Sequence, residues 1–185
     1  MRKDFGSKTW LYPMPVLIVA SYDAHGLPNA MNAAWGGIYT DNTVGICLAE
    51  DHKTTQNILA TKSFTVSVAT VDHVSACDYL GLVSGVKVPD KLQRAAFHTI
   101  QSKHVNAPII EELPMTLECE MVSYDIESNH LVGRIVNVSV DESVLTEGRI
   151  DISKLRPITY DPVSHRYYEL GNVVANAFSV GKEYM

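Results

Sequence analysis

Alternating apolar and polar residues mark several β-strands in this chain. Residues 63–68 and 115–121 alternate without a break, which predicts two half-buried strands whose polar side chains face water. Shorter alternating sets predict further strands at 44–48 and 136–140. Residues 15–20 are apolar throughout and rich in β-branched side chains, so we expect this strand to be covered on both faces.

Helix signals are fewer and shorter. Residues 52–62 predict one helix, with Asp51 as its N-cap and Lys62 in its last turn. Two shorter helices are predicted behind capping aspartates, one from Asp72 to the break at Gly81 and one from Asp90 through Ala96.

Together these elements indicate a mainly β protein. Turn residues at 23–26 and 127–130 predict hairpins. The strands do not alternate regularly with long helices, which disfavours a parallel, doubly wound sheet. No repeat, low-complexity tract or linker divides the 185 residues. We therefore expect a single domain, residues 1–185, in which about six or seven antiparallel strands with short peripheral helices form a closed or nearly closed barrel.

Composition and charge exclude some classes of function. Hydrophobic residues make up 46% and charged residues 19%, enough for a sizeable core. The formal net charge is −6 and no basic stripe occurs, which argues against nucleic-acid binding. Met1–Gly6 is not followed by the apolar segment of a secretion signal, and the run 16–20 is too short to cross a bilayer.

The three cysteines lie far apart in the sequence and cannot all pair within the chain. No Cys or His spacing fits a zinc site. Cys47 and Cys119 lie inside apolar runs, which predicts buried thiols in a reducing compartment. We expect a soluble, cytoplasmic protein without membrane contact and without a bound metal.

Familiar nucleotide and hydrolase motifs are absent. No G-x-G-x-x-G follows a strand, and Gly181-Lys182 lacks the other residues of a phosphate-binding P-loop. Ser84-Gly85 lacks the upstream glycine of a nucleophile elbow. A ligand site must therefore be sought from local chemistry.

The segment Leu48–Thr55 is the first such place. A strand runs directly into a helix N-terminus there, where free backbone N–H groups favour an anion. Lys53 adds positive charge, and the hydroxyls of Thr54 and Thr55 can donate hydrogen bonds to phosphate oxygens. A plain capped surface helix explains the same pattern, and the acidic pair Glu50-Asp51 opposes an anion.

The segment Asn29–Gly37 is the second. Its small residues let a planar ligand approach the backbone, its asparagines offer donors and acceptors, and Trp35 can wall a pocket. An irregular strand with a core tryptophan is the alternative.

Three further segments carry weaker signals. Lys91, behind Ser84-Gly85, can reach an anion or a carbonyl oxygen, although most such lysines are surface groups. His130 heads a strand and gains interest only if the fold brings it beside Lys91. Of the adjacent tyrosines Tyr167-Tyr168, one can cover a ring while the other packs in the core, or both can belong to an edge strand.

Taken in order, these segments resemble the flavin-reductase-like family with an FMN-binding split barrel, and within it the flavoredoxin group. The resemblance runs from about Pro13 to Gly171. It implies an antiparallel six-stranded split β-barrel of the Greek-key type, a homodimer, and flavin mononucleotide (FMN) near the subunit interface. Many relatives carry Arg where His52-Lys53 stand and Ser or Thr where Ala33-Ala34 stand.

The resemblance also implies an activity and a set of cofactor-binding residues. The expected activity is that of an NAD(P)H:flavin oxidoreductase, which passes electrons from NAD(P)H through FMN to a downstream acceptor without a catalytic side chain. A flavin-binding electron carrier is one alternative, and a split barrel that binds haem through His130 or His25 is another. The implied cofactor-binding residues are Asn29, Met31, Asn32, Ala33, Trp35, Leu48, His52, Lys53, Thr54, Thr55, Ser84, Gly85, Lys91, His130 and Tyr168.

Overall fold

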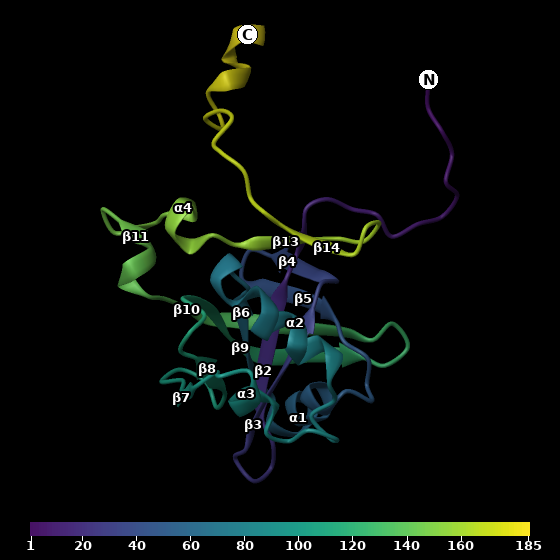
Figure 1. The fold of residues 1–185 in the computed structure, drawn as a ribbon, viewed down its shortest axis with the longest axis vertical. Helices are drawn as coiled ribbons and strands as arrows, with labels where there is room; N and C mark the ends of the chain where they lie inside the picture. Colours follow the sequence, from purple (N-terminus) through teal and green to yellow (C-terminus); the bar gives the residue numbers. More distant parts are fainter.

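The centre of the molecule is one antiparallel sheet of seven strands (Figure 1). The computed structural model describes residues 1–185. Across the sheet the strands follow the order β3-β2-β6-β9-β10-β5-β4. Their bounds are β2 Leu17–Tyr22, β3 Pro28–Ala33, β4 Gly36–Thr40, β5 Thr43–Cys47, β6 Ser63–Val68, β9 Met115–Asp125 and β10 His130–Val140. The sheet curls as a half-barrel, which confirms the predicted antiparallel, barrel-like β fold.

The two faces of β2 belong to two separate core clusters. Ile18 and Ala20 pack with Leu80 on one side, whereas Val19 packs with Phe64 on the other. All five side chains are essentially inaccessible to water. The prediction that the apolar run at 15–20 is covered on both faces is therefore confirmed.

The long β9–β10 hairpin gives the sheet its strongest bend. The pairing of these strands shifts register twice, after Val132 and after Ile135, as at β-bulges. Gly133 follows the first shift, and a Cβ atom there would overlap the ring of Phe64. The glycine thus lets the bent strand lie directly against the aromatic core.

Helices and three small sheets surround the main sheet. The helices are α1 Lys53–Thr61, α2 Val74–Leu82, α3 Lys91–Arg94 and α4 Ile152–Leu155, with 3-10 turns at Val71–His73, Glu142–Val144 and Val180–Tyr184. The small sheets contain β1 Met14–Pro15 with β13 Ile158–Asp161 and β14 Arg166–Glu169, β7 Thr99–Gln101 with β8 Pro108–Ile110, and β11 Leu145–Thr146 with β12 Arg149–Ile150. No helix is long and apolar enough to span a lipid bilayer.

The helix boundaries correct several predictions. His52, not Asp51, occupies the N-cap position of α1, because its backbone is extended (φ −71°, ψ 133°). Lys62 is not in the last turn but is the left-handed C-cap (φ 60°). Asp72 lies in a 3-10 turn before α2, and α2 continues through Gly81 to Leu82.

The third predicted helix is shorter than expected and is capped differently. Asp90 holds the N-cap position of α3, but its carboxylate accepts a hydrogen bond from Arg94 Nε at 2.9 Å and not from a helix amide. The helix ends at Arg94, and Ala96 takes a left-handed conformation.

Most of the polar positions predicted in β6 and β9 are buried, contrary to the prediction that they face water, and of these only Glu120 stays partly exposed. Thr65 donates to the carbonyl of Pro108 at 2.6 Å, and Ser67 bonds the Thr116 hydroxyl at 2.8 Å. Glu118, 1% exposed, accepts hydrogen bonds from Ser102 and Asn137. Alternation separated the two faces correctly, but the segment around β7 and β8 covers the polar one and supplies its hydrogen-bond partners.

The cysteine prediction holds for Cys119 and fails for Cys47. Cys119 and Cys77 are buried, and desolvation raises the pKa of each thiol to about 12. Cys47 is exposed, because it ends β5 on the face opposite to Ile46, which lies in the core.

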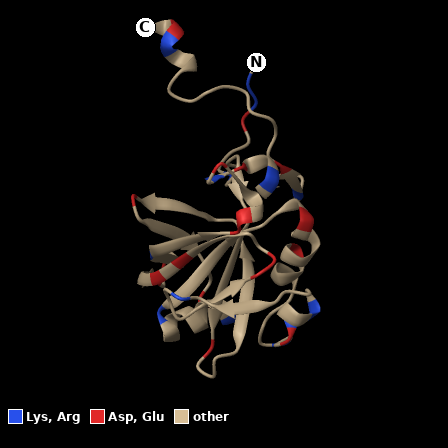
Figure 2. Ribbon diagram, turned by 90° about the vertical axis from the view of Figure 1, so that its left-hand side faces the viewer, with Lys and Arg blue, Asp and Glu red and all other residues tan.

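Both ends of the chain leave the body on the same side (Figures 1 and 2). The C-terminal arm, residues 171–185, contacts the body little, and its large apolar side chains are almost fully exposed, including Val174, Phe178 and Tyr184. Apolar side chains so exposed on a folded monomer commonly mark a contact surface.

Candidate functional site

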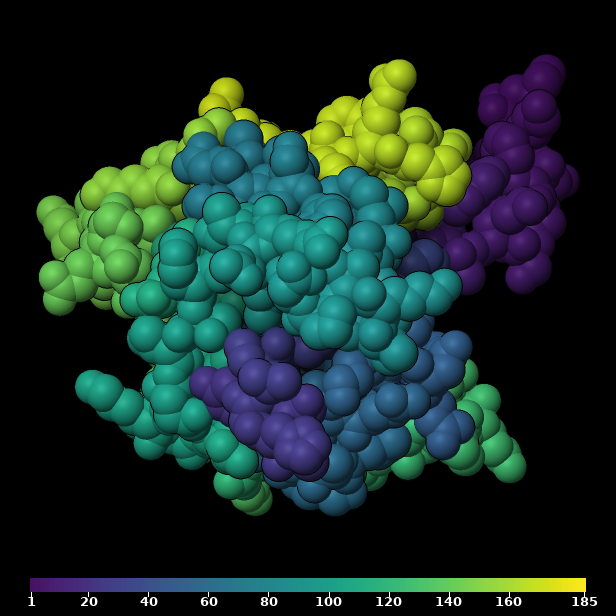
Figure 3. Space-filling view, turned by 60° about the horizontal axis from the view of Figure 1, so that its bottom comes forward, coloured from purple at the N-terminus to yellow at the C-terminus, as the bar shows by residue number.

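Two cavities join into one groove between the end of β3, the start of α1 and the end of α2. The broad cavity has a volume of about 450 Å³ and the narrow one about 210 Å³. Both are lined by Met31, Asn32, His52, Gly81 and Leu82. In the space-filling view, the atoms of α2 and α3 face those of α1 and the β2–β3 turn across this side of the molecule (Figure 3).

Most of the residues predicted from the sequence line this groove. The broad cavity contains Met31, Asn32, Ala33, Trp35, Leu48 and His52. The narrow cavity adds Asn29, Lys53, Thr54, Ser84, Gly85 and Lys91. Thr55, His130 and Tyr168 line neither cavity. The fold therefore gathers segments from β3, α1 and the loop after α2 at one place.

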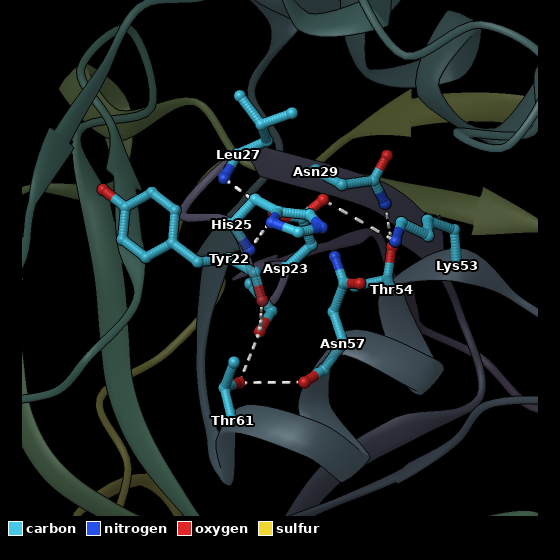
Figure 4. Close-up of polar contacts among 10 residues, drawn as sticks. Tyr22, Asp23, His25, Leu27, Asn29, Lys53, Thr54, Asn57 and Thr61 are labelled. Atoms are coloured by element: carbon cyan, nitrogen blue, oxygen red, sulfur yellow. Dashed lines mark hydrogen bonds and ion pairs between the residues drawn. The ribbon is translucent and has the colours of Figure 1, made fainter.

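The start of α1 forms one end of the narrow cavity (Figure 4). His52 provides no side-chain cap, so the first backbone N–H groups of the helix have no capping oxygen from this residue. The Thr54 hydroxyl accepts a hydrogen bond from Asn29 Nδ2 at 2.6 Å, which leaves its own proton free to donate. Helix N–H groups and a free hydroxyl are donors suited to an oxyanion.

Lys53 is held beside the same helix terminus. Its Nζ lies 3.8 Å from Asp23 Oδ2, and Asp23 accepts backbone hydrogen bonds from His25 at 2.8 Å and Leu27 at 2.9 Å (Figure 4). The hydrogen bond from the Leu27 amide is the main cause that lowers the pKa of Asp23. The carboxylate thus steadies the lysine without lining either cavity.

Two buried polar atoms of α1 have no partner within the protein. They are Thr55 Oγ1 and Asn57 Nδ2, on residues that are 1% and 3% exposed. A buried polar group without a partner destabilises a fold by about 1–3 kcal/mol. The predicted role of Thr55 in binding phosphate stays a prediction, and its hydroxyl has no competing partner.

Lys91 is buried at the opposite side of the narrow cavity. It is 2% exposed, and its Nζ donates to the carbonyls of Leu80 and Val83, each at 3.1 Å. An ammonium group has three donors, so one remains for a ligand. Desolvation lowers the pKa of Lys91 to about 8, and no carboxylate compensates its charge. A nearby anion or electron-rich oxygen would be stabilised by this group.

Glycines shape the groove where the backbone approaches it. A Cβ atom on Gly85 would overlap the side-chain oxygen of Asn29, and one on Gly81 would lie 3.2 Å from Asn32 Cβ. Gly85 therefore lets the loop after α2 lie directly against β3, and Gly81 lets the last turn of α2 approach the same strand closely.

The broad cavity has a different character. Val16, Met31 and Leu48 give it apolar surface, and Trp35 stands 49% exposed at its edge. Its far wall comes from Asp78, Tyr160, His165 and Tyr167, of which Asp78 and Tyr160 were not predicted from the sequence. The alternation of Tyr167 and Tyr168 along a short strand was the available signal, and it is Tyr167 that faces the cavity.

Two predicted residues lie elsewhere. His130 packs edge-on against Tyr39, with ring centroids 5.4 Å apart, in a cavity of about 530 Å³ on the other side of Trp35. It does not meet Lys91, which lines a different cavity. Tyr168 lines a separate hollow together with Tyr12.

The donor set fits a flavin nucleotide better than a metal ion. The narrow end offers cationic and neutral donors, whereas Glu50 and Asp51, which opposed an anion in the sequence, do not line either cavity. The broad end offers mostly apolar lining. The structure holds no group of three or more His, Cys, Asp or Glu side chains that could coordinate a metal.

Comparisons with known proteins agree with this geometry. Residues 9–167 match the family model described as flavin reductase like domain. The chain is similar to flavoredoxin of Desulfovibrio vulgaris (Miyazaki F), with 35% identity and a TM-score of 0.94 over 98% of this chain and 100% of that one. It is also similar to flavoredoxin from Methanosarcina acetivorans, with 27% identity and a TM-score of 0.89 over the whole of both chains. An FMN-binding domain of a flavin reductases-like enzyme from Shewanella baltica OS155, 18% identical over 88% of each chain, shares the fold with a TM-score of 0.79.

Proposed function

The chain belongs to the flavin reductase-like family, and from this premise we propose that it binds FMN in the groove and passes electrons from NAD(P)H to a downstream acceptor. The observation that carries the proposal is the joined groove, whose narrow end offers donors for a phosphate and whose broad end offers mostly apolar lining for a ring system. The similarity to two flavoredoxins over nearly the full chain supports it.

The residues divide the work of binding. The α1 terminus, Lys53 and Thr54 hold the phosphate, since they supply N–H, ammonium and hydroxyl donors at one place. Asn32 and Trp35 position the ribityl chain and the ring from the end of β3. No side chain acts as an acid or base, because bound FMN supplies the hydride chemistry and the protein supplies position and charge.

Lys91 tunes the cofactor. Its buried ammonium has one free donor and no carboxylate nearby, so it stabilises negative charge that develops on the edge of a reduced ring that reaches from the broad cavity into the narrow one. In this proposal Lys91 raises the reduction potential of the flavin.

We also propose a homodimer with FMN near the interface, working in the cytoplasm. Beside Trp35, the side chains of Ile38 and Tyr39 are 71% and 60% exposed, and the C-terminal arm carries exposed Phe178 and Tyr184. A second copy of the chain would cover these apolar surfaces. Sedimentation at micromolar concentration tests the dimer, and a monomer would contradict it.

Anaerobic mixing tests the electron flow. The FMN-loaded protein is mixed with NADH or NADPH, and bleaching of the flavin absorption is followed. Rapid bleaching with one nucleotide supports the oxidoreductase. A flavin that stays oxidised with both nucleotides but is reduced by dithionite points to an electron carrier. The names of the two similar structures, both flavoredoxins, favour this second candidate.

A further inference from the structure

The far wall of the broad cavity carries polar chemistry that FMN binding does not use. Tyr160 and Tyr167 come from the β13–β14 hairpin, His165 from its turn, and Asp78 from α2. We propose that this wall binds the second reactant, the electron acceptor, as a neutral planar molecule whose carbonyl oxygen accepts a hydrogen bond from Tyr160. The inference rests on the proposed function, because the flavin is proposed to lie against β3 in the same cavity.

Tyr160 and His165 form an isolated pair. The Tyr160 hydroxyl and His165 Nδ1 lie 2.8 Å apart, and neither atom has another hydrogen-bond partner in the protein. In the tautomer that carries its proton on Nδ1, His165 donates to the Tyr160 oxygen. The hydroxyl proton of Tyr160 is then free to donate to a ligand oxygen in the cavity.

Tyr167 and Asp78 define the rest of the ligand. The Tyr167 hydroxyl donates to Asp78 Oδ1 at 2.7 Å, so this tyrosine presents its ring and not a free donor. The rings of Tyr167 and Tyr160 lie 5.9 Å apart at 50°. The carboxylate of Asp78 disfavours an anionic ligand by like-charge repulsion. One free donor between aromatic faces, next to a negative charge, selects a neutral planar molecule with one carbonyl edge.

The hairpin turn holds the imidazole in place. His165 has a left-handed backbone (φ 54°), which non-glycine residues adopt rarely. Its amide donates to the Asp161 carbonyl at 3.0 Å, and the Asp161 carboxylate accepts from the Val163 amide at 2.8 Å. The turn thereby fixes the position of His165 next to Tyr160.

A chromophoric aldehyde tests the wall. 4-(Dimethylamino)benzaldehyde is neutral and planar, and its absorption shifts to the red when its carbonyl oxygen accepts a hydrogen bond. We expect FMN-loaded protein to bind it with a red shift. Tyr160→Phe should weaken binding by about five- to tenfold, as for the loss of one hydrogen bond, and abolish the shift. His165→Asn, which tolerates the left-handed turn, should weaken binding in the same direction.

Tyr79→Phe is the matched control, because Tyr79 adjoins Asp78 on α2 but lines neither cavity. Equal affinity and equal spectra for wild type and Tyr160→Phe would overturn the proposal, as would an absence of binding by wild type. FMN titration of each variant separates the two claims. A protein that takes up FMN but not the aldehyde refutes the wall alone. A protein that takes up no FMN refutes the proposed function, and the aldehyde titration of the ligand-free protein still decides the wall.

Discussion

The two ends of the groove are built in different ways. The donors of the narrow end lie in a few short sequence segments, mainly the start of α1 and the loop before α3. The broad end joins β3 to residues more than a hundred positions away, in the β13–β14 hairpin. Charge separates them too, since Lys53 and Lys91 line only the narrow end and Asp78 lines only the broad one.

This difference indicates a division of labour. An end with fixed donors and tight glycine contacts suits a permanently bound, anionic part of a cofactor. An end with a wider opening, aromatic walls and one isolated hydroxyl pair suits a molecule that enters and leaves. Changes at the narrow end should therefore alter FMN affinity, while changes to Tyr160 and His165 at the broad end should alter only the binding of the second reactant.

The largest effect is expected from Gly85→Ala. The new methyl group would overlap Asn29 and displace it, which breaks its 2.6 Å hydrogen bond to Thr54. We expect FMN affinity, measured by fluorescence quenching, to fall by about 100-fold, the equivalent of about 3 kcal/mol. Gly171→Ala is the control, because a methyl group there meets no atom within 4 Å. Unchanged affinity in Gly85→Ala would show that the loop after α2 is not part of the cofactor site.

A smaller effect on FMN affinity is expected from Thr55→Val, together with a change of the opposite sign in the stability of the ligand-free protein. The substitution keeps the shape of the side chain and removes the buried hydroxyl that lacks a partner. If that hydroxyl serves the phosphate, FMN affinity falls by about tenfold, or about 1.4 kcal/mol. The ligand-free protein should become more stable to urea by about 1 kcal/mol, because an unsatisfied polar group is gone. Equal FMN affinity in the two proteins would remove the predicted role of Thr55.

The pH dependence of FMN binding should show the charge of Lys91. Burial lowers the pKa of Lys91 to about 8 in the free protein, and an adjacent electron-rich ring raises it again in the complex. Affinity should then be constant below about pH 8 and fall about fivefold by about pH 9, because binding above the free pKa requires uptake of a proton. Lys91→Gln should bind more weakly, lose this decline, and lower the reduction potential in a dye-equilibration titration. A wild-type profile that stays flat through pH 9 would place the ammonium away from the flavin.

The sequence singled out residues of the narrow end and of the β3 side of the broad end, but not Tyr160 or Asp78, for a physical reason. Helix termini, glycines and hydroxyl side chains can be recognised from the adjacent residues in the sequence. His52–Thr54 and Ser84-Gly85 could therefore be identified without knowledge of the fold. The pairing of Tyr160 with His165 depends on how β13 and β14 pack on the main sheet. The alternating pattern also separated the apolar face of β6 and β9 from the polar face, but it did not show that β7 and β8 cover the polar face. For the same reason it predicted that Cys47 is buried, whereas the side chain is exposed.

The comparison of FMN with riboflavin tests the central claim most directly, because the two ligands differ only in the phosphate. Titration of the ligand-free protein with each, followed by flavin fluorescence, measures what the α1 terminus, Lys53 and Thr54 contribute. We predict that FMN binds at least about 100-fold more tightly, since charged hydrogen bonds contribute about 1.5–3 kcal/mol each. Equal affinity for the two flavins, or no binding of either, would contradict the account.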